Sequence, residues 1–258
     1  MKKLAMIAAV AVAGSVFADS GIESANIVGY VTSPTISANK VSLGTMPFSS
    51  TGSELVKIQD LAVPNAEPCL FKNRATQAVQ LQVWNGSAYT VYYYVSDAYD
   101  EEADDEVTGW ANNKGDYVND EYAPGTGYWY KYPVSESTYV LPGQVVSNAS
   151  VTKNVYATKL NLVGNPYPMS LSLSKISTSV AAPAFKNRAT QAVQLQIWNG
   201  SAYNVYYYVN DAYDEEADDE VTGWANNKGD YVDATGLDAT FGLWAKSPAA
   251  DGTITFTK

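Results

Sequence analysis

Two clusters of carboxylates are the residues of this chain whose type and spacing could most readily do chemistry. The segment DAYDEEADDEVTGWANNKGDYV occurs at residues 97–118 and again, without a change, at 211–232, and each copy begins with seven acidic residues in ten positions. Ca²⁺ takes six to eight oxygen ligands from carboxylates, amides and carbonyls. The clusters therefore predict calcium sites, with the candidate ligands Asp97, Asp100, Glu101, Asp104, Asp105 and Asp116 in the first copy and Asp211, Asp214, Glu215, Asp218, Asp219 and Asp230 in the second.

The acidic segments leave a second interpretation open. Neither copy has the D-x-[DN]-x-[DN]-G spacing with a later Glu that marks an EF-hand calcium loop. Acidic runs of this length are also typical of solvated, mobile loops that keep a protein soluble. The segments are interpreted either as calcium sites or as solvated loops that bind ions diffusely.

The residue types that the chain lacks argue against catalysis. It has no histidine, which removes Ser-His-Asp and Cys-His nucleophile activation and the usual zinc ligand sets. The clustered acids are sequence neighbours on one expected loop, whereas the two acids of a glycosidase are held at a fixed separation across a sugar. The sequence therefore predicts a protein that is not an enzyme.

Aromatic side chains suggest an alternative function, carbohydrate binding. Exposed rings stack on sugar faces, and the VYYYV strand of each repeat places two tyrosines on one face. Two like modules would also gain avidity. Aromatic residues in β-proteins more often fill cores, and the six tryptophans are interpreted as core residues. The candidate residues of this lectin-like alternative are Tyr92, Tyr94, Tyr206 and Tyr208.

The elements that must position these residues belong to an internal duplication. Residues 71–118 match 185–232 at 45 of 48 positions, and weaker matches flank this block on both sides. Each repeat is rich in Val, Thr, Tyr and Trp with closely spaced turn residues, which favours short strands. Asn85-Gly86 and Asn199-Gly200 each predict a hairpin. The one helix expected in the mature chain spans residues 53–61.

These patterns predict an all-β fold of two tandem β-sandwich-like domains, the first at residues 19–143 and the second at 144–258. Residues 1–18 combine two lysines, a short apolar run and a small-residue ending, which predicts a cleaved signal peptide. No later segment is apolar enough to span a bilayer, so we expect no membrane insertion. The sequence predicts a secreted or cell-surface protein.

The net charge and the single cysteine of the chain limit which binding partners and which disulfides are expected. Removing two lysines with the signal peptide leaves 14 basic and 27 acidic residues, a net charge of −13. Such a surface repels nucleic acid, so no nucleic-acid partner is expected. Cys69 is the only cysteine, which rules out an internal disulfide. Its thiol could pair two chains, but the expected role is that of a small, partly buried apolar residue.

Several short phrases resemble a known class of exported domains. SANIVGYVT at 24–32, VWNGSAYT at 83–90, GTGYWYKYP at 125–133 and LNLVGNPYP at 160–168 are similar to secreted β-domains of surface-associated bacteria, particularly the planctomycete and verrucomicrobial groups. The resemblance implies export and a β fold, and it carries no catalytic residues with it. The long acidic segment after the hairpin departs from that pattern.

The leading hypothesis is an exported, non-catalytic structural or adhesive surface protein. Exposed strand edges could join copies into a filament or a layer, so self-association is expected, with cell-surface or matrix glycans as the alternative partners. Residues 19–36 could be donated to a neighbouring copy or could supply an edge strand of the first domain. The sequence leaves this choice open.

Overall fold

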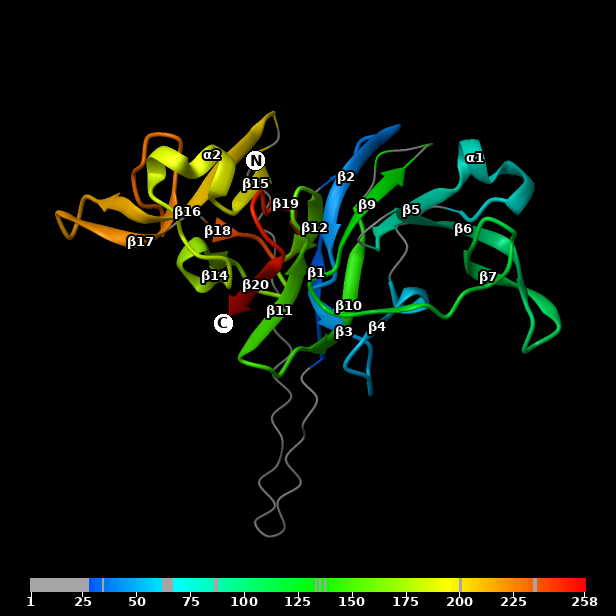
Figure 1. The fold of residues 1–258 in the computed structure, drawn as a ribbon. Helices are drawn as coiled ribbons and strands as arrows, with labels where there is room; N and C mark the ends of the chain where they lie inside the picture. Colours follow the sequence, from blue (N-terminus) through cyan, green and yellow to red (C-terminus); the bar gives the residue numbers. More distant parts are fainter. Residues whose placement is uncertain are drawn as a thin grey trace, which may run out of the picture.

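The computed structural model describes residues 28–258 except 34, 62–66, 86–87, 133, 135, 137, 200 and 234–235. Antiparallel strands dominate this part of the chain (Figure 1), so the prediction of an all-β fold is confirmed. No helix in the described residues is long and apolar enough to cross a membrane. The predicted signal peptide at 1–18 lies outside the described residues.

The first repeat folds into a five-stranded and a three-stranded antiparallel sheet. The larger sheet has the order β2-β9-β5-β6-β7, formed by Lys40–Thr45, Gly127–Tyr132, Val79–Trp84, Tyr89–Asp100 and Asp105–Ala111. The smaller sheet has the order β1-β10-β3, formed by Val28–Thr32, Val140–Val145 and Phe48–Ser49. A short pair, β4 (Val56–Lys57) with β8 (Glu121–Tyr122), completes this repeat.

The second repeat has an equivalent larger sheet and short pair, whereas the third strand of its smaller sheet follows the short-pair strand in sequence instead of preceding it. Its larger sheet has the order β12-β19-β15-β16-β17, formed by Leu160–Gly164, Gly242–Lys246, Gln194–Trp198, Tyr203–Asp214 and Asp219–Ala225. Its smaller sheet has the order β11-β20-β14, formed by Ser150–Val155, Gly252–Thr257 and Ile176–Thr178, and β13 (Leu171–Ser172) pairs with β18 (Gly236–Leu237). Strand β10 crosses the expected domain boundary at 143/144 and pairs with β1 and β3 of the first repeat.

Each repeat buries one hydrophobic core between its two sheets. In the first repeat Leu81 lies opposite Tyr92 in the β5-β6 pair, and both side chains are fully buried together with Leu141 of the smaller sheet. In the second repeat Leu195 of the larger sheet packs into one cluster with Phe256 of the smaller one. Two sheets closed over a shared core give each repeat its sandwich-like form.

Strand β5 shows which face of its hairpin is buried. Val79, Leu81 and Val83 point into the core, whereas Trp84 is only half-buried on the other face. The predicted hairpins at Asn85 and Asn199 are confirmed by the β5-β6 and β15-β16 pairings. Gly86 and Gly200, the second residues of those turns, lie outside the described residues.

The expected helix at 53–61 is wrong. Residues 56–57 form strand β4, and only Ile58–Asp60 turns into a 3₁₀ helix, η1. The Ile58 N–H donates to the Asp120 carbonyl at 2.9 Å, and Val56 and Ile58 are buried. Tertiary pairing thus overrides a weak helical preference. The helices that form are α1 (Arg74–Gln77) and α2 (Arg188–Gln191), together with the 3₁₀ turns η2 (Phe71–Asn73), η3 (Leu173–Lys175) and η4 (Phe185–Asn187).

Strand β1 supplies an edge of the first domain. It pairs with β10 over Val28–Thr32, and β10 in turn pairs with β3. This is one of the two arrangements expected for residues 19–36, although residues 19–27 lie outside the described part of the chain. Self-association through a strand edge stays a prediction.

The two repeats meet at equivalent strand ends, a contact that we call the junction. Gly44 bridges to Phe241, and Thr126 bridges to Val163. The Gly164 N–H donates to the Gly125 carbonyl at 3.0 Å. Because each side contributes the same strands, the junction is close to a two-fold arrangement of one structural unit.

Lys153 provides a pH-dependent contribution at the junction. Its Nζ donates to the Ala123 carbonyl at 3.0 Å and to the Thr126 hydroxyl at 3.2 Å. Desolvation lowers the pKa of this lysine to about 8. Between pH 8 and its ordinary value of 10.5 the unfolded chain binds more protons than the folded chain, so this residue adds stability as pH rises.

We expect Lys153→Met to remove that pH dependence and to raise stability at neutral pH. From pH 7 to pH 9 the free energy of unfolding of the unmodified chain should gain about 1 kcal/mol relative to the variant. Urea unfolding at the two pH values measures this difference. Parallel pH profiles for the two proteins would contradict the assignment.

Candidate functional site

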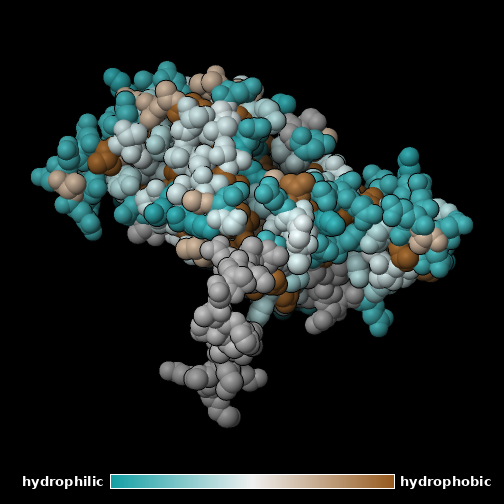
Figure 2. All heavy atoms as spheres, turned by 90° about the horizontal axis from the view of Figure 1, so that it is seen from below, coloured by the Kyte–Doolittle hydropathy of each residue, from teal (hydrophilic) through white to brown (hydrophobic). Residues whose placement is uncertain are grey.

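The acidic segments form two protruding hairpins, which we call the acidic fingers: residues 97–111 and 211–225. The finger of the first repeat is the outer part of β6 with β7, and the second is the outer part of β16 with β17. They project from opposite ends of the molecule (Figure 1), and hydrophilic residues gather at both ends in the space-filling view (Figure 2). The segments are not the loops that the sequence led us to expect, because paired strands run almost to each tip.

The carboxylates of the fingers accept hydrogen bonds from the finger and from the 3₁₀ turn beside it. Asp97 Oδ1 accepts from the Phe71 N–H at 2.6 Å, and Asp100 Oδ1 accepts from the Glu102 N–H at 2.9 Å. Asp104, at positive φ, accepts from the Tyr99 hydroxyl at 2.5 Å. The same bonds recur in the second finger at Asp211, Asp214 and Asp218.

The remaining predicted ligands are also placed. Asp105 accepts from the Glu106 N–H and Asp116 from the Asn112 amide, with the same contacts at Asp219 and Asp230. Glu101 and Glu215 are exposed in the turns. Among the described residues no three or more acidic, cysteine or histidine side chains are gathered to hold a metal. The carboxylates order each finger internally, and calcium binding stays a prediction.

A base of aromatic and cationic side chains supports each finger. The Arg74 guanidinium lies 4.0 Å from the centre of the Phe71 ring and 5.6 Å from that of Tyr93. Arg188 repeats both contacts in the second repeat at 4.0 and 5.5 Å. Cation–π contacts of this kind stabilise by about 0.5–1 kcal/mol when exposed. The shared sequence block thus encodes one finger twice.

Melting the protein with calcium tests the predicted metal site. Since the fingers are ordered by their own hydrogen bonds, we expect 2 mM CaCl₂ and 2 mM MgCl₂ to shift the melting temperature equally, within about 1–2 °C, through charge screening. Differential scanning calorimetry with chelator present gives the reference. A calcium-specific rise that Asp104→Asn plus Asp218→Asn removes would instead support specific binding.

The four tyrosines predicted to stack on sugars do not present free rings. Tyr92 is fully buried, and its hydroxyl donates to Asp120 and lies beside the Tyr122 hydroxyl. Tyr206 is 8% exposed in the core of the second repeat. Tyr94 and Tyr208 are half-buried and pack edge-on against Trp110 and Trp224. The expectation of exposed rings is wrong for Tyr92 and Tyr206, because both face inward between the sheets.

A different set of aromatic side chains lines a pocket between the repeats, which we call the junction pocket. Its volume is about 660 Å³, within the 300–1,000 Å³ range that is ordinary for ligand sites. Both repeats contribute to its walls. The lining residues are Ser33, Thr35, Ile36, Val41, Ser42, Leu43, Trp129 and Tyr139 from the first repeat and Trp198, Asn199, Tyr203 and Phe241 from the second.

Strand alternation explains why these rings are available. Tyr128 and Tyr130 of β9 point into the first core, so Trp129 between them points outward toward the second repeat. There it lies 5.9 Å from Trp244, measured between ring centroids. Trp198 and Tyr203 pack edge-on at 5.0 Å between centroids, as the pair next to the turn of the β15-β16 hairpin.

The junction pocket combines open ring surface with unused polar atoms. Trp198 is 39% exposed and Tyr203 is 38% exposed. No hydrogen bond within the described residues uses the hydroxyls of Thr35, Ser42 or Tyr203, or the indole N–H of Trp198. The wall therefore offers two ring faces, three hydroxyls and one donor to a ligand.

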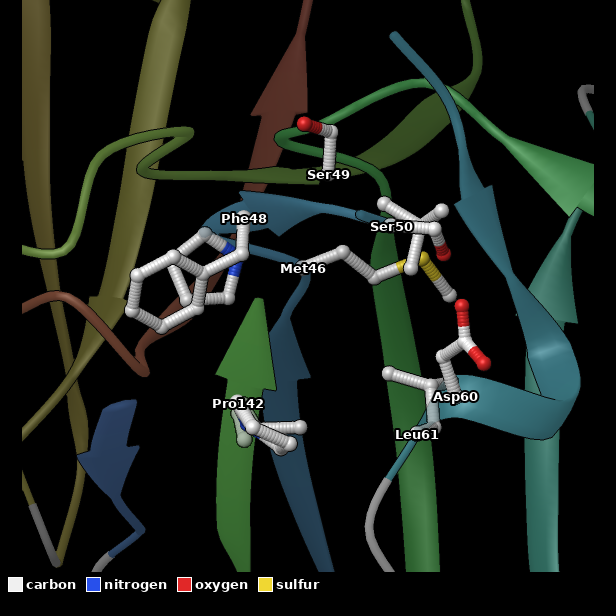
Figure 3. Close-up of a pocket in the computed structure, with 10 residues that line it drawn as sticks. Met46, Phe48, Ser49, Ser50, Asp60, Leu61 and Pro142 are labelled. Carbon is white, nitrogen blue, oxygen red and sulfur yellow. The ribbon is translucent and has the colours of Figure 1, made fainter. Parts of the chain in front are cut away.

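A second, much smaller pocket lies beside strand β3. The Met46 side chain points across it toward Asp60 and Leu61 (Figure 3). Its volume is about 10 Å³, which is close to the minimum that one water molecule needs. It can take no organic ligand.

The interpretation of all six tryptophans as core residues holds for only two. Trp110 and Trp224 are fully buried, whereas Trp84, Trp129, Trp198 and Trp244 lie on the outer sheet faces near the junction. The signal was present in the strand alternation: Trp84 and Trp198 are out of phase with the Val and Leu residues before them. No sequence pattern predicts the junction, so the sequence does not indicate that the two repeats bring these rings together.

No family model, curated protein or solved structure matches the chain.

Proposed function

We propose that this chain is an exported, non-catalytic adhesive protein that binds carbohydrate in the junction pocket. The observation that carries the proposal is the pair of exposed rings, Trp198 and Tyr203, beside hydroxyls that no hydrogen bond among the described residues uses. Sugars present an apolar C–H face and a rim of hydroxyl groups. A ring face bordered by hydroxyls and an N–H complements both.

The composition of the pocket supports binding without turnover. None of its lining residues is acidic, basic or a cysteine. General acid–base catalysis on a sugar needs a pair of positioned carboxylates. The acids of the chain that are most densely clustered lie in the fingers, at opposite ends of the molecule (Figure 1).

The acidic fingers support the adhesive part of the proposal through their charge. The chain carries a net charge of −11, and the fingers hold much of it away from the junction pocket. Exposed negative charge keeps a tyrosine-rich protein soluble and discourages unspecific contact with anionic surfaces. Specific attachment would then depend on the junction pocket.

We expect Trp198→Ala plus Tyr203→Ala to weaken carbohydrate binding at least about 10- to 30-fold, the cost of removing a central aromatic contact. Binding to a broad glycan array, followed by affinity measurement on the strongest ligand, gives the comparison. Tyr213→Ala is the matched control, since Tyr213 is an exposed tyrosine of the same repeat located on the finger. Equal binding by the double variant, or silence of the unmodified chain on the array, would contradict the proposal.

A further inference from the structure

We infer that the ligand of the junction pocket is a neutral oligosaccharide, bound at one site per chain and in contact with both repeats. This inference rests on the proposed function and specifies its ligand class and its stoichiometry. Three observations lead to it: the charge of the lining, the reach of the pocket across the junction, and a difference between the two hairpins.

The charge of the lining selects against acidic sugars. No lysine or arginine lines the junction pocket, although arginine and lysine are the usual partners of carboxylates and sulfates. An anionic sugar would lose hydration there without gaining a counter-charge. The acidic fingers and the overall charge of −11 would repel it further on approach. An uncharged sugar has no charge to dehydrate in the pocket, and the acidic fingers do not repel it.

The extent of the pocket favours several sugar units. Val41 and Leu43 of β2 form one side, and Trp198 and Tyr203 form the other. The volume of about 660 Å³ is in the middle of the usual range for ligand pockets, about 300–1,000 Å³. A ligand that touches both sides must therefore extend across the junction, which suits an oligosaccharide better than a single sugar.

The equivalent surface on the first repeat is closed by its own side chains. Tyr89, the counterpart of Tyr203, accepts a hydrogen bond from Trp129 Nε1 at 3.0 Å. Trp84, the counterpart of Trp198, is half-buried, and its Nε1 is enclosed without a partner in the described structure. Trp84 and Tyr89 pack at 5.0 Å between centroids, as Trp198 and Tyr203 do, so the two hairpins differ in the bond to Trp129 and in the enclosed indole. Among the described residues the second hairpin is therefore the one that leaves its rings open to a ligand.

A sequence difference between the near-identical blocks falls beside the open site. Asn204 stands where the first repeat has Thr90. Its side-chain oxygen accepts from the Asn199 amide at 3.2 Å, and Asn199 is part of the pocket lining. This bond links the start of β16 to the hairpin turn. Asn204 is therefore a positioning residue for the second hairpin.

Isothermal titration of the full-length purified protein with defined hexasaccharides tests the inference. The neutral probes are cellohexaose, chitohexaose and mannohexaose, and the anionic probes are hexamannuronate and a heparin-derived hexasaccharide. We expect at least one neutral probe to bind with a stoichiometry of one per chain and at least about 10-fold more tightly than either anionic probe. Trp198→Ala should weaken this binding at least about 10-fold, whereas Trp84→Ala should leave the affinity within about threefold, with melting curves confirming that both variants fold.

The possible outcomes distinguish a failure of this inference from a failure of the proposed carbohydrate binding. Preferred binding of an anionic probe that Trp198→Ala abolishes would overturn the neutral class while leaving carbohydrate binding in place. Two equivalent sites, one lost in Trp84→Ala and one in Trp198→Ala, would overturn the single-site stoichiometry. Silence of every probe on the unmodified protein would overturn the proposed function together with this inference.

Discussion

Trp224→Ala should lower the free energy of unfolding by about 3–5 kcal/mol, the usual cost of truncating a buried tryptophan. The Trp224 ring is almost fully buried, packs edge-on against Tyr208, and donates through Nε1 to the Ile176 carbonyl at 2.7 Å. The variant loses the apolar contacts, leaves a cavity and leaves that carbonyl without its donor. Urea unfolding followed by circular dichroism measures the change.

Trp198→Ala is the matched control for that experiment. It removes the same side chain from the same repeat, but Trp198 lies at the surface of the junction pocket. We expect its free energy of unfolding to fall by less than about 1 kcal/mol, as for surface substitutions that leave little cavity. A large loss of stability in Trp198→Ala would show that this ring supports the fold, and the case for a ligand site would weaken.

Gly242→Ala should destabilise the protein by about 1–3 kcal/mol, because overpacking a tight contact forces the backbone to move. A Cβ at this position would lie 2.6 Å from the Gly44 carbonyl oxygen across the junction. The Gly44 backbone cannot rotate away from the added methyl group as a flexible side chain could. The shift should open the junction and reduce binding in the junction pocket as well as stability.

Gly29→Ala provides the comparison for the junction variant. Gly29 also lies in a strand, but its added Cβ would meet only side-chain atoms, the nearest at 3.4 Å. We expect a change of less than about 1 kcal/mol from ordinary contact at that distance. If chemical unfolding gave equal losses for both variants, close packing at Gly242 would not be what holds the repeats together.

The sequence was sufficient for the fold class because the signals for strands are local. Val79, Leu81 and Val83 alternate with polar residues, and Asn85 precedes a glycine, so β5 and its hairpin follow from short-range pattern. The helix predicted at 53–61 does not form because β4, which lies in that segment, pairs with β8, a strand far away in the sequence. A nine-residue helical pattern is too weak to resist that pairing.

The candidate site could not be predicted in the same way. Tyr92 and Trp84 lie on opposite faces of one hairpin, and only the packing of the second sheet decides which face is buried. The junction pocket needs Trp129 and Trp198 to meet from positions 69 residues apart in the chain. Calcium binding by the acidic fingers stays a prediction, because carboxylates that cap their own turns look the same in sequence as carboxylates that bind calcium.

Indole N–H resonances of the six tryptophans offer the most direct test that the junction pocket is the ligand site. In a ¹H–¹⁵N spectrum recorded during titration with the best-binding neutral hexasaccharide, we predict that Trp198 and Trp129 shift, while the buried Trp110 and Trp224 stay in place. Assignment by single Trp→Phe variants identifies each signal. Saturable binding that moves neither Trp198 nor Trp129 would contradict the account.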